Sequence, residues 1–111
     1  MKISVIGGGS WGTTLAQVLQ DNGHETLVYD INKEAVDKIN NGIHPFFDNE
    51  ISGIKATAQL NDALLFSDYL VLAVPTKFMR ESLREINALS HRKNYFINVS
   101  KGIEPSTLKR V

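Results

Sequence analysis

Residues 2–12 read KISVIGGGSWG, and the chain's architecture can be worked out from this stretch. Residues 2–7 are rich in β-branched and apolar side chains and end in glycine, which is typical of a buried parallel strand. In residues 10–20 the spacing of the apolar side chains changes to i, i+3 and i+4, which is typical of a helix. Asn22-Gly23 then supplies a helix stop. The sequence therefore predicts a strand, a glycine-rich turn and a helix at the start of the chain.

Strand and helix patterns continue to alternate along the rest of the chain. Further strands are expected at residues 25–30, 54–57, 69–74 and 95–99, and helices are expected after caps at Asn32, Asn61 and Thr76. This alternation predicts an α/β fold, a Rossmann-type doubly wound parallel sheet of about five strands in the order 3-2-1-4-5 with helices on both faces. The chain stops in a polar stretch without a sixth strand, which we interpret as a piece of something longer.

Composition excludes several classes of function. Twelve basic residues balance twelve acidic ones, so the chain lacks the positive charge typical of nucleic-acid or membrane-surface binding. There is no cysteine, which excludes disulfides and thiolate chemistry, and the three histidines show no metal-ligand spacing, so no metal is expected. No apolar run approaches the roughly 20 residues of a membrane span. We therefore expect a cytoplasmic domain without membrane insertion.

The glycines at positions 7, 9 and 12 fit the pattern G-x-G-x-x-G directly after a strand and at the opening of a helix. Gly7 would permit the tight turn, Gly9 would let the backbone approach a pyrophosphate, and Gly12 would let the helix pack closely on the strand. The free N–H groups at the helix start would then hold the phosphates. The alternative is a merely flexible strand–helix turn.

Asp30 ends the second strand, eighteen residues after Gly12. A carboxylate there can accept hydrogen bonds from an adenosine ribose, and the alternative is a turn residue leading into the Asn32 cap. A ribose contact would favour NADH over NADPH, because the carboxylate would face the extra phosphate of NADPH. Trp11 has two interpretations, stacking on the ligand or covering the helix start.

Four segments are similar to bacterial NAD(P)-dependent glycerol-3-phosphate dehydrogenase. They are GGGSWGTTLA at 7–16, NGHE at 22–25, AVPT at 73–76 and SKGIE at 100–104. The resemblance spans essentially the whole chain, which would then be the family's NAD(P)-binding domain over residues 1–111. The family's helical second domain, which carries the general-base lysine and most of the substrate site, would be missing, so no catalytic residue is expected here.

The resemblance also implies individual contacts. Besides the glycines and Asp30, it implies cofactor contacts by Ser10, Trp11, Ile31, Phe47, Pro75 and Lys101. Phe47 would replace an aromatic that the family usually places before Leu-Pro, in a loop that is shorter here. Lys101 would touch both the nicotinamide and the glycerol phosphate. Its place after a strand near the switch point independently suits a cation that polarises a reacting carbonyl oxygen, the alternative being a solvated surface lysine.

The function implied is hydride transfer between NAD(P)H and the dihydroxyacetone phosphate/sn-glycerol 3-phosphate pair, in phospholipid precursor synthesis. Two alternatives are a non-catalytic NAD-sensing regulatory module and the nucleotide domain of a related hydroxy-acid or sugar-acid dehydrogenase. The run KGIE at 101–104 argues against both. The expected partners are the dinucleotide and, in the full-length protein, the small phosphorylated substrate. Any oligomer would form through the missing domain.

Overall fold

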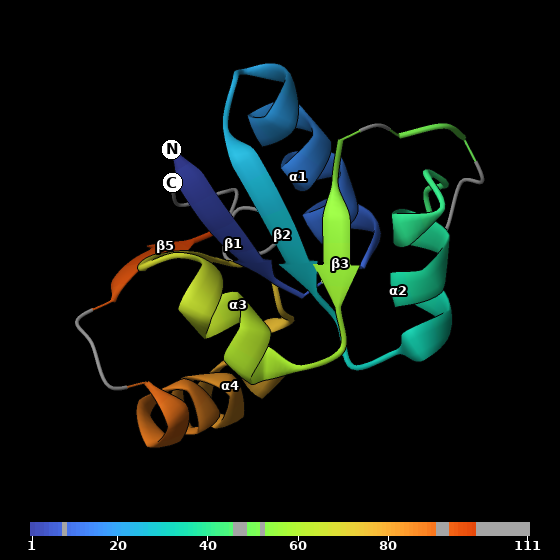
Figure 1. Cartoon of the computed structure of the whole chain (residues 1–111). Coiled ribbons are helices and arrows are strands. Elements are labelled where there is room, and N and C mark those ends of the chain that lie inside the picture. The colour runs from blue at the N-terminus through green and yellow to red at the C-terminus, as the bar shows by residue number, and fades with distance from the viewer. Residues whose placement is uncertain (8, 46–48, 52, 91–93, 100–111) are drawn as a thin grey trace, which may run out of the picture.

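The computed structural model describes residues 1–7, 9–45, 49–51, 53–90 and 94–99, with only the backbone of Ser10 and Thr76. Within these residues nine helices and strands alternate (Figure 1). They are β1 (Lys2–Ile6), α1 (Ser10–Asp21), β2 (Glu25–Tyr29), α2 (Lys33–Asn40), β3 (Lys55–Thr57), α3 (Leu60–Phe66), β4 (Tyr69–Leu72), α4 (Thr76–Leu89) and β5 (Tyr95–Asn98).

The five strands form one parallel sheet in the order β3-β2-β1-β4-β5, which confirms the predicted topology. The chain builds outward from β1 to β3, then returns through α3 to place β4 on the other side of β1. The carboxyl ends of β1 and β4 are therefore neighbours although the strands are far apart in sequence. In Figure 1 the strands β1 to β3 run downward, so their carboxyl ends lie at the lower edge. Because the order in which strands are added to the sheet changes direction at β1, there is room for a ligand at that edge.

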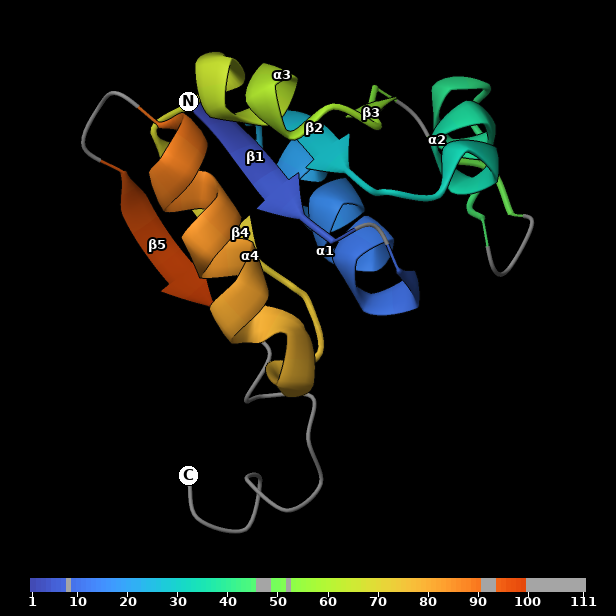
Figure 2. The same ribbon diagram turned by 90° about the horizontal axis from the view of Figure 1, so that it is seen from below.

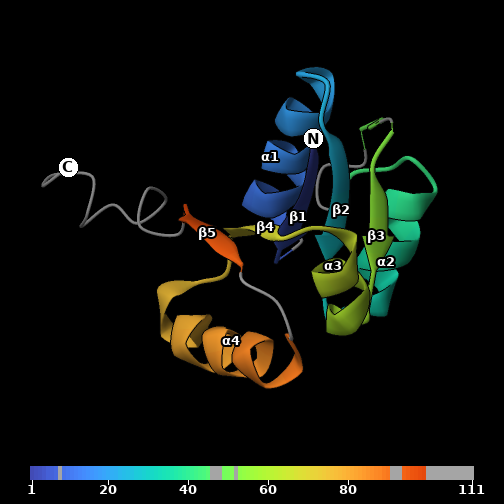
Figure 3. The same ribbon diagram turned by 60° about the vertical axis from the view of Figure 1, so that its left-hand side comes forward.

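Two apolar cores lie on the two faces of the sheet. One core joins sheet residues such as Val5 and Val28 to Ala16 of α1 and Ile39 of α2. The other core packs α3 and α4 against the opposite face, with Ile86 only 1% exposed. Figures 2 and 3 show α1 and α3 on opposite sides of the sheet. The right-handed crossovers require this arrangement, because the chain travels in opposite directions on either side of β1.

The predicted cap of α2 is confirmed, whereas that of α3 is wrong. The Asn32 side chain caps α2 as expected, accepting hydrogen bonds from the amides of Glu34 at 2.9 Å and Ala35 at 3.4 Å. Asn61 is not the cap of α3, because the helix already begins at Leu60. Thr57 organises that turn instead, since its hydroxyl accepts from the Gln59 amide and donates to Asp62.

Thr76 is likewise not a cap, because it is the first residue of α4 and Pro75 precedes it in the cap position. Proline has no N–H and a fixed φ, so it suits the entry to a helix without needing a side-chain cap. No helix within the described ranges is long and apolar enough to cross a membrane.

Replacing Ser4 by alanine tests how β1 is tied to the returning part of the chain. The buried Ser4 hydroxyl donates to the carbonyl oxygen of Ala63 in α3 at 2.6 Å, across 59 positions of sequence. Ser4→Ala should lower the free energy of unfolding by about 1–3 kcal/mol, because a buried carbonyl loses its hydrogen bond. Urea denaturation measures this loss.

Ser82→Ala is the matched control for this measurement. Ser82 lies in α4 and is only partly buried, at the wall of an open cavity, so the same change of residue type removes no buried hydrogen bond to the sheet. It should change the free energy of unfolding by no more than about 0.5 kcal/mol. Equal stability of the Ser4 and Ser82 variants would contradict the role assigned to the Ser4 hydroxyl.

Candidate functional site

The turn after β1 is held between the ends of two neighbouring strands. The Gly7 amide donates to the carbonyl oxygen of Tyr29 at 2.9 Å. Gly7 has a φ of +105°, and a Cβ added there would lie 2.9 Å from the carbonyl oxygen of Ala73. Both the backbone conformation and the close approach of β4 therefore require glycine at this position.

The other two motif glycines have different surroundings. A Cβ on Gly12, in the first turns of α1, would collide with the carbonyl oxygen of Gly7, so the helix can pack this tightly only without a side chain. A Cβ on Gly9 would meet no described atom within 4 Å, and the φ of Gly9 is −58°. Backbone packing thus requires glycine at positions 7 and 12, whereas Gly9 leaves its backbone open to a ligand.

The start of α1 carries backbone donors and a positive end. Gly9 is the cap residue, and the Thr13 amide donates to its carbonyl oxygen at 2.9 Å to close the first turn. Among the described residues no side chain caps the helix, and its first turn contains no acidic residue. The first N–H groups of a helix have no partner inside it and, with the helix dipole, they favour a bound anion.

A cavity of about 580 Å³ lies next to this helix start, at the carboxyl edge that Figure 2 shows end-on. The structure brings together in its lining seven of the residues that the sequence predicted, which are Gly7, Gly9, Trp11, Gly12, Asp30, Ile31 and Pro75. These residues come from the loops after β1, β2 and β4 and from the first turn of α1. The cavity thus crosses the point at which the strand order reverses, where ligands bind in doubly wound sheets.

The position of Asp30 is compatible with both of its interpretations. One carboxylate oxygen, Oδ1, accepts a hydrogen bond from the Asn32 amide at 2.9 Å, which is the turn leading into the cap of α2. The same residue lines the cavity, so the second oxygen can face a ligand. The neighbouring Ile31 is 83% exposed and Trp11 is 44% exposed. Both side chains are therefore accessible to a ligand in the cavity.

Three predicted contacts cannot be compared with this geometry. Phe47 and Lys101 lie outside the described residues, and Ser10 is described only by its backbone at the first position of α1. Their cofactor contacts stay predictions.

The cavity also has residues that sequence reasoning missed. They are Ile6, Tyr29, Leu60, Ala73, Val74, Phe78, Glu81, Ser82 and Glu85. Four of them stand at 78, 81, 82 and 85, so they form one face of α4 with helical spacing. The apolar stripe of α4 indicates only its buried face, and the same helical period applied to the other face identifies these four residues.

Tyr29 has a perturbed hydroxyl at the cavity wall. Burial raises the pKa of Tyr29, and the carboxylates of Glu85 and Asp30 raise it further. A tyrosine hydroxyl is protonated at neutral pH even without this shift, so it is available as a hydrogen-bond donor, and the raised pKa keeps it protonated further into the alkaline range. The shift also shows that Glu85 of α4 and Asp30 after β2 act electrostatically on the same group.

The sheet order, the glycine turn and the cavity at the strand reversal define a Rossmann-type α/β domain. A sequence model described as the N-terminus of NAD-dependent glycerol-3-phosphate dehydrogenase matches residues 2–111. The chain therefore belongs to the NAD-dependent glycerol-3-phosphate dehydrogenase family.

Individual relatives agree with this family. Glycerol-3-phosphate dehydrogenase (NAD(P)+) of Acholeplasma laidlawii is 76% identical over all 111 residues, and that of Macrococcus caseolyticus is 40% identical. The chain spans about a third of the length of these relatives, 34% and 35%. Its fold matches the crystal structure of glycerol-3-phosphate dehydrogenase from Coxiella burnetii with a TM-score of 0.75 and 24% identity. That match covers 87% of this chain and 31% of the other.

Alanine at Gly12 and at Gly9 should have different effects on stability. Helix propensity alone would make Gly12→Ala stabilising by about 1 kcal/mol. The collision with the Gly7 carbonyl should reverse that sign and lower the free energy of unfolding by about 2 kcal/mol or more. Gly9→Ala should change it by less than about 0.5 kcal/mol, because its Cβ has open space. Denaturant unfolding of both variants measures the difference, and a stabilised Gly12→Ala would refute the packing described.

Proposed function

We propose that this chain binds a nicotinamide dinucleotide in the cavity at the carboxyl edge of the sheet. It would be the dinucleotide-binding domain, residues 1–111, of an enzyme that transfers hydride between NADH and the dihydroxyacetone phosphate/sn-glycerol 3-phosphate pair. The observation that carries the proposal is that the open Gly9 backbone, the uncapped start of α1 and the Asp30 carboxylate line one cavity. Membership of the dehydrogenase family supplies the reaction.

The residues present fit the cofactor. The backbone at Gly9 has room for a pyrophosphate, and the amides at the start of α1 supply donors for its oxygens. Asp30 follows β2, where its carboxylate can accept from the hydroxyls of the adenosine ribose. The volume of about 580 Å³ lies within the usual range for ligand cavities. When bound, the nicotinamide carries the hydride, and the protein orients it.

The remaining predicted contacts complete the proposed site. Trp11 of α1, Ile31 after β2 and Pro75 after β4 would contact the dinucleotide from three parts of the cavity lining. Ser10 and Phe47 would add contacts to the dinucleotide. Lys101 would pair with the substrate phosphate or polarise the carbonyl oxygen that gains charge as hydride arrives. These roles rest on the family resemblance.

The proposal extends to the rest of the protein. The general-base lysine would lie beyond Val111 in a helical domain, together with most of the substrate site and any oligomer interface. The enzyme would work in the cytoplasm in phospholipid precursor synthesis. Neither the sensing module nor a related dehydrogenase is favoured by a particular described feature.

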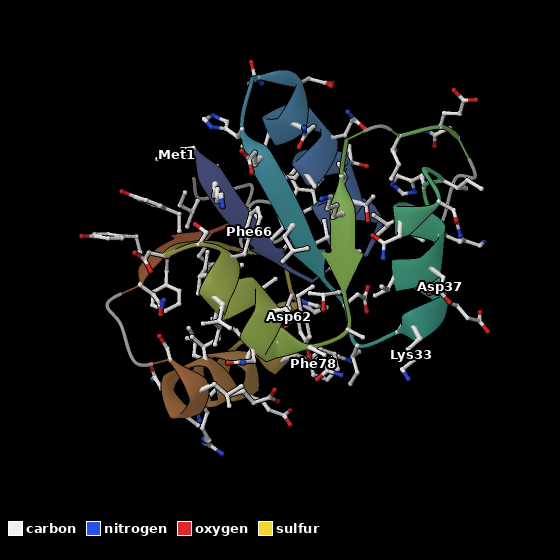
Figure 4. All side chains as sticks on the ribbon, in the orientation of Figure 1. Met1, Lys33, Asp37, Asp62, Phe66 and Phe78 are labelled. Atoms are coloured by element: carbon white, nitrogen blue, oxygen red, sulfur yellow. The ribbon has the colours of Figure 1, made fainter. Side chains whose placement is uncertain are left out.

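The charge of the cavity favours NADH over NADPH. Three carboxylates line it, Asp30, Glu81 and Glu85, and its described lining includes no basic side chain. The 2′-phosphate of NADPH would come within contact distance of Asp30 and would be repelled. Lys33 is the nearest cation in sequence, but it is exposed on α2 and does not line the cavity. Figure 4 shows Lys33 on α2, to the right of Phe78 of α4.

Titration of both reduced cofactors tests the proposed preference. NADH should bind about tenfold or more tightly than NADPH, equivalent to about 1.4 kcal/mol. Asp30→Asn should bring the two affinities close together, because it removes the charge while keeping an oxygen for the Asn32 amide. Fluorescence of Trp11, which lines the cavity and is the chain's sole tryptophan, reports binding. Asp37→Asn on the exposed side of α2 is the control. Equal affinities in the unaltered chain would show that Asp30 does not face the ribose.

The purified 111-residue chain should bind NADH without reducing dihydroxyacetone phosphate. The dinucleotide site would be present, whereas the proposed general base would lie beyond Val111. NADH oxidation followed by absorbance, beside calorimetric titration of NADH, measures both properties on one sample. Turnover above a control without protein would overturn the assignment of the base to the rest of the enzyme.

A further inference from the structure

Helix α4 has two faces with different surroundings. Met79, Leu83 and Ile86 pack into the core on one face of the sheet. Phe78, Glu81, Ser82 and Glu85 point the other way and line the cavity. The acidic pair is unusual in this position, because the start of α1 on the same cavity attracts anions. The proposed phosphate contacts therefore do not explain the carboxylates of α4.

The part of the cavity lined by α4 and by the residues after β2 offers apolar side chains to the faces of an aromatic ring. Phe78 of α4 is 47% exposed and Ile31, after β2, is 83% exposed, although both are large apolar residues that line the cavity. Leu60 at the start of α3 adds another apolar wall. Exposed apolar side chains around one cavity are typical of a site for a planar ligand. Asp30 lies next to Ile31, so the ring in this position would be the base attached to the ribose that Asp30 contacts.

The edge that this ring presents to α4 must carry hydrogen-bond donors. Glu81 and Glu85 stand one turn apart, one and two turns after Phe78 on the same face. Ionised carboxylates only accept hydrogen bonds. The C6 amino group of adenine offers two N–H donors, one for each carboxylate, whereas hypoxanthine has an oxygen at C6 and only a single donor beside it, at N1.

Tyr29 lines the same cavity as these carboxylates. Burial raises the pKa of Tyr29, and the carboxylates of Glu85 and Asp30 raise it further. The carboxylate that would contact the ribose and the two carboxylates of α4 line one cavity. A nucleoside offers donors to both, from its ribose hydroxyls at one end and from its base edge at the other.

We propose that Glu81 and Glu85 of α4 select adenine by accepting hydrogen bonds from its exocyclic amino group. This inference rests on the proposed dinucleotide function and assigns the base specificity of the same site. The two carboxylates act on binding and take no part in hydride transfer. They discriminate by attraction to an amino group and by repulsion of an oxygen at the same position.

The test compares NADH with reduced nicotinamide hypoxanthine dinucleotide, which differs from NADH only in its base. Calorimetric titration of the 111-residue chain should show NADH bound about tenfold or more tightly. In the double variant Glu81→Ala and Glu85→Ala the ratio should fall to about threefold or less, chiefly because NADH binds more weakly. Alanine suits an exposed helix, so α4 should remain intact, and circular dichroism verifies this.

Asp37→Ala is the matched control, because it removes an exposed acid from α2, well away from α4 (Figure 4). It should keep the ratio of the unaltered chain. A ratio near one in the unaltered chain, or an unchanged ratio in the double variant, overturns the base specificity while leaving the dinucleotide function standing. If neither dinucleotide binds the unaltered chain, the proposed function fails and this inference fails with it.

Discussion

The close packing of backbone at the end of β1 is the constraint on which the rest of the structure depends. Gly7 fits between the ends of β2 and β4, and Gly12 lets α1 start directly against the Gly7 carbonyl. Neither position accepts a Cβ without displacing backbone. The backbone at Ala73, just after β4, packs against Gly7, and the Gly7 carbonyl packs against α1 at Gly12. The backbone of Gly7 therefore determines both where β4 ends and where α1 begins. The cavity exists because the strand order reverses here.

The cavity that results has two regions of opposite electrostatic character. Backbone amides and the positive end of α1 lie on one side, beside the open backbone of Gly9. The carboxylates of Asp30, Glu81 and Glu85 lie in its wall, and those of Asp30 and Glu85 act on Tyr29 from two elements. A dinucleotide has matching regions, an anionic pyrophosphate in the middle and hydrogen-bond donors on its ribose and adenine. Orientation of the cofactor would follow from this distribution of charge.

The sequence predicted the sheet because its signals are local and strong. The run KISVIG, the glycine spacing and the Asn32 cap each determine structure within a few residues, and the strand order followed from connection rules. Helix starts were harder, since Thr57 organises the entry to α3 from outside the helix and Pro75 starts α4 without a side-chain cap. The second wall of the cavity was missed because it requires knowing which face of α4 lines the cavity. That orientation depends on tertiary packing, and the apolar stripe at Met79, Leu83 and Ile86 indicates only the buried face.

A nicotinamide dinucleotide bound as proposed would lie across the carboxyl edge of the sheet with its pyrophosphate on the start of α1. Titration of NADH into the ¹⁵N-labelled chain, followed by amide chemical shifts, measures where it binds. Saturable shifts should be largest at Gly9 and residues 11–13, with further shifts at Ile31 and Phe78. The opposite end of the sheet, at Gly23 and Glu25, should stay unchanged. Shifts confined to that opposite end, or none that saturate, would contradict the account.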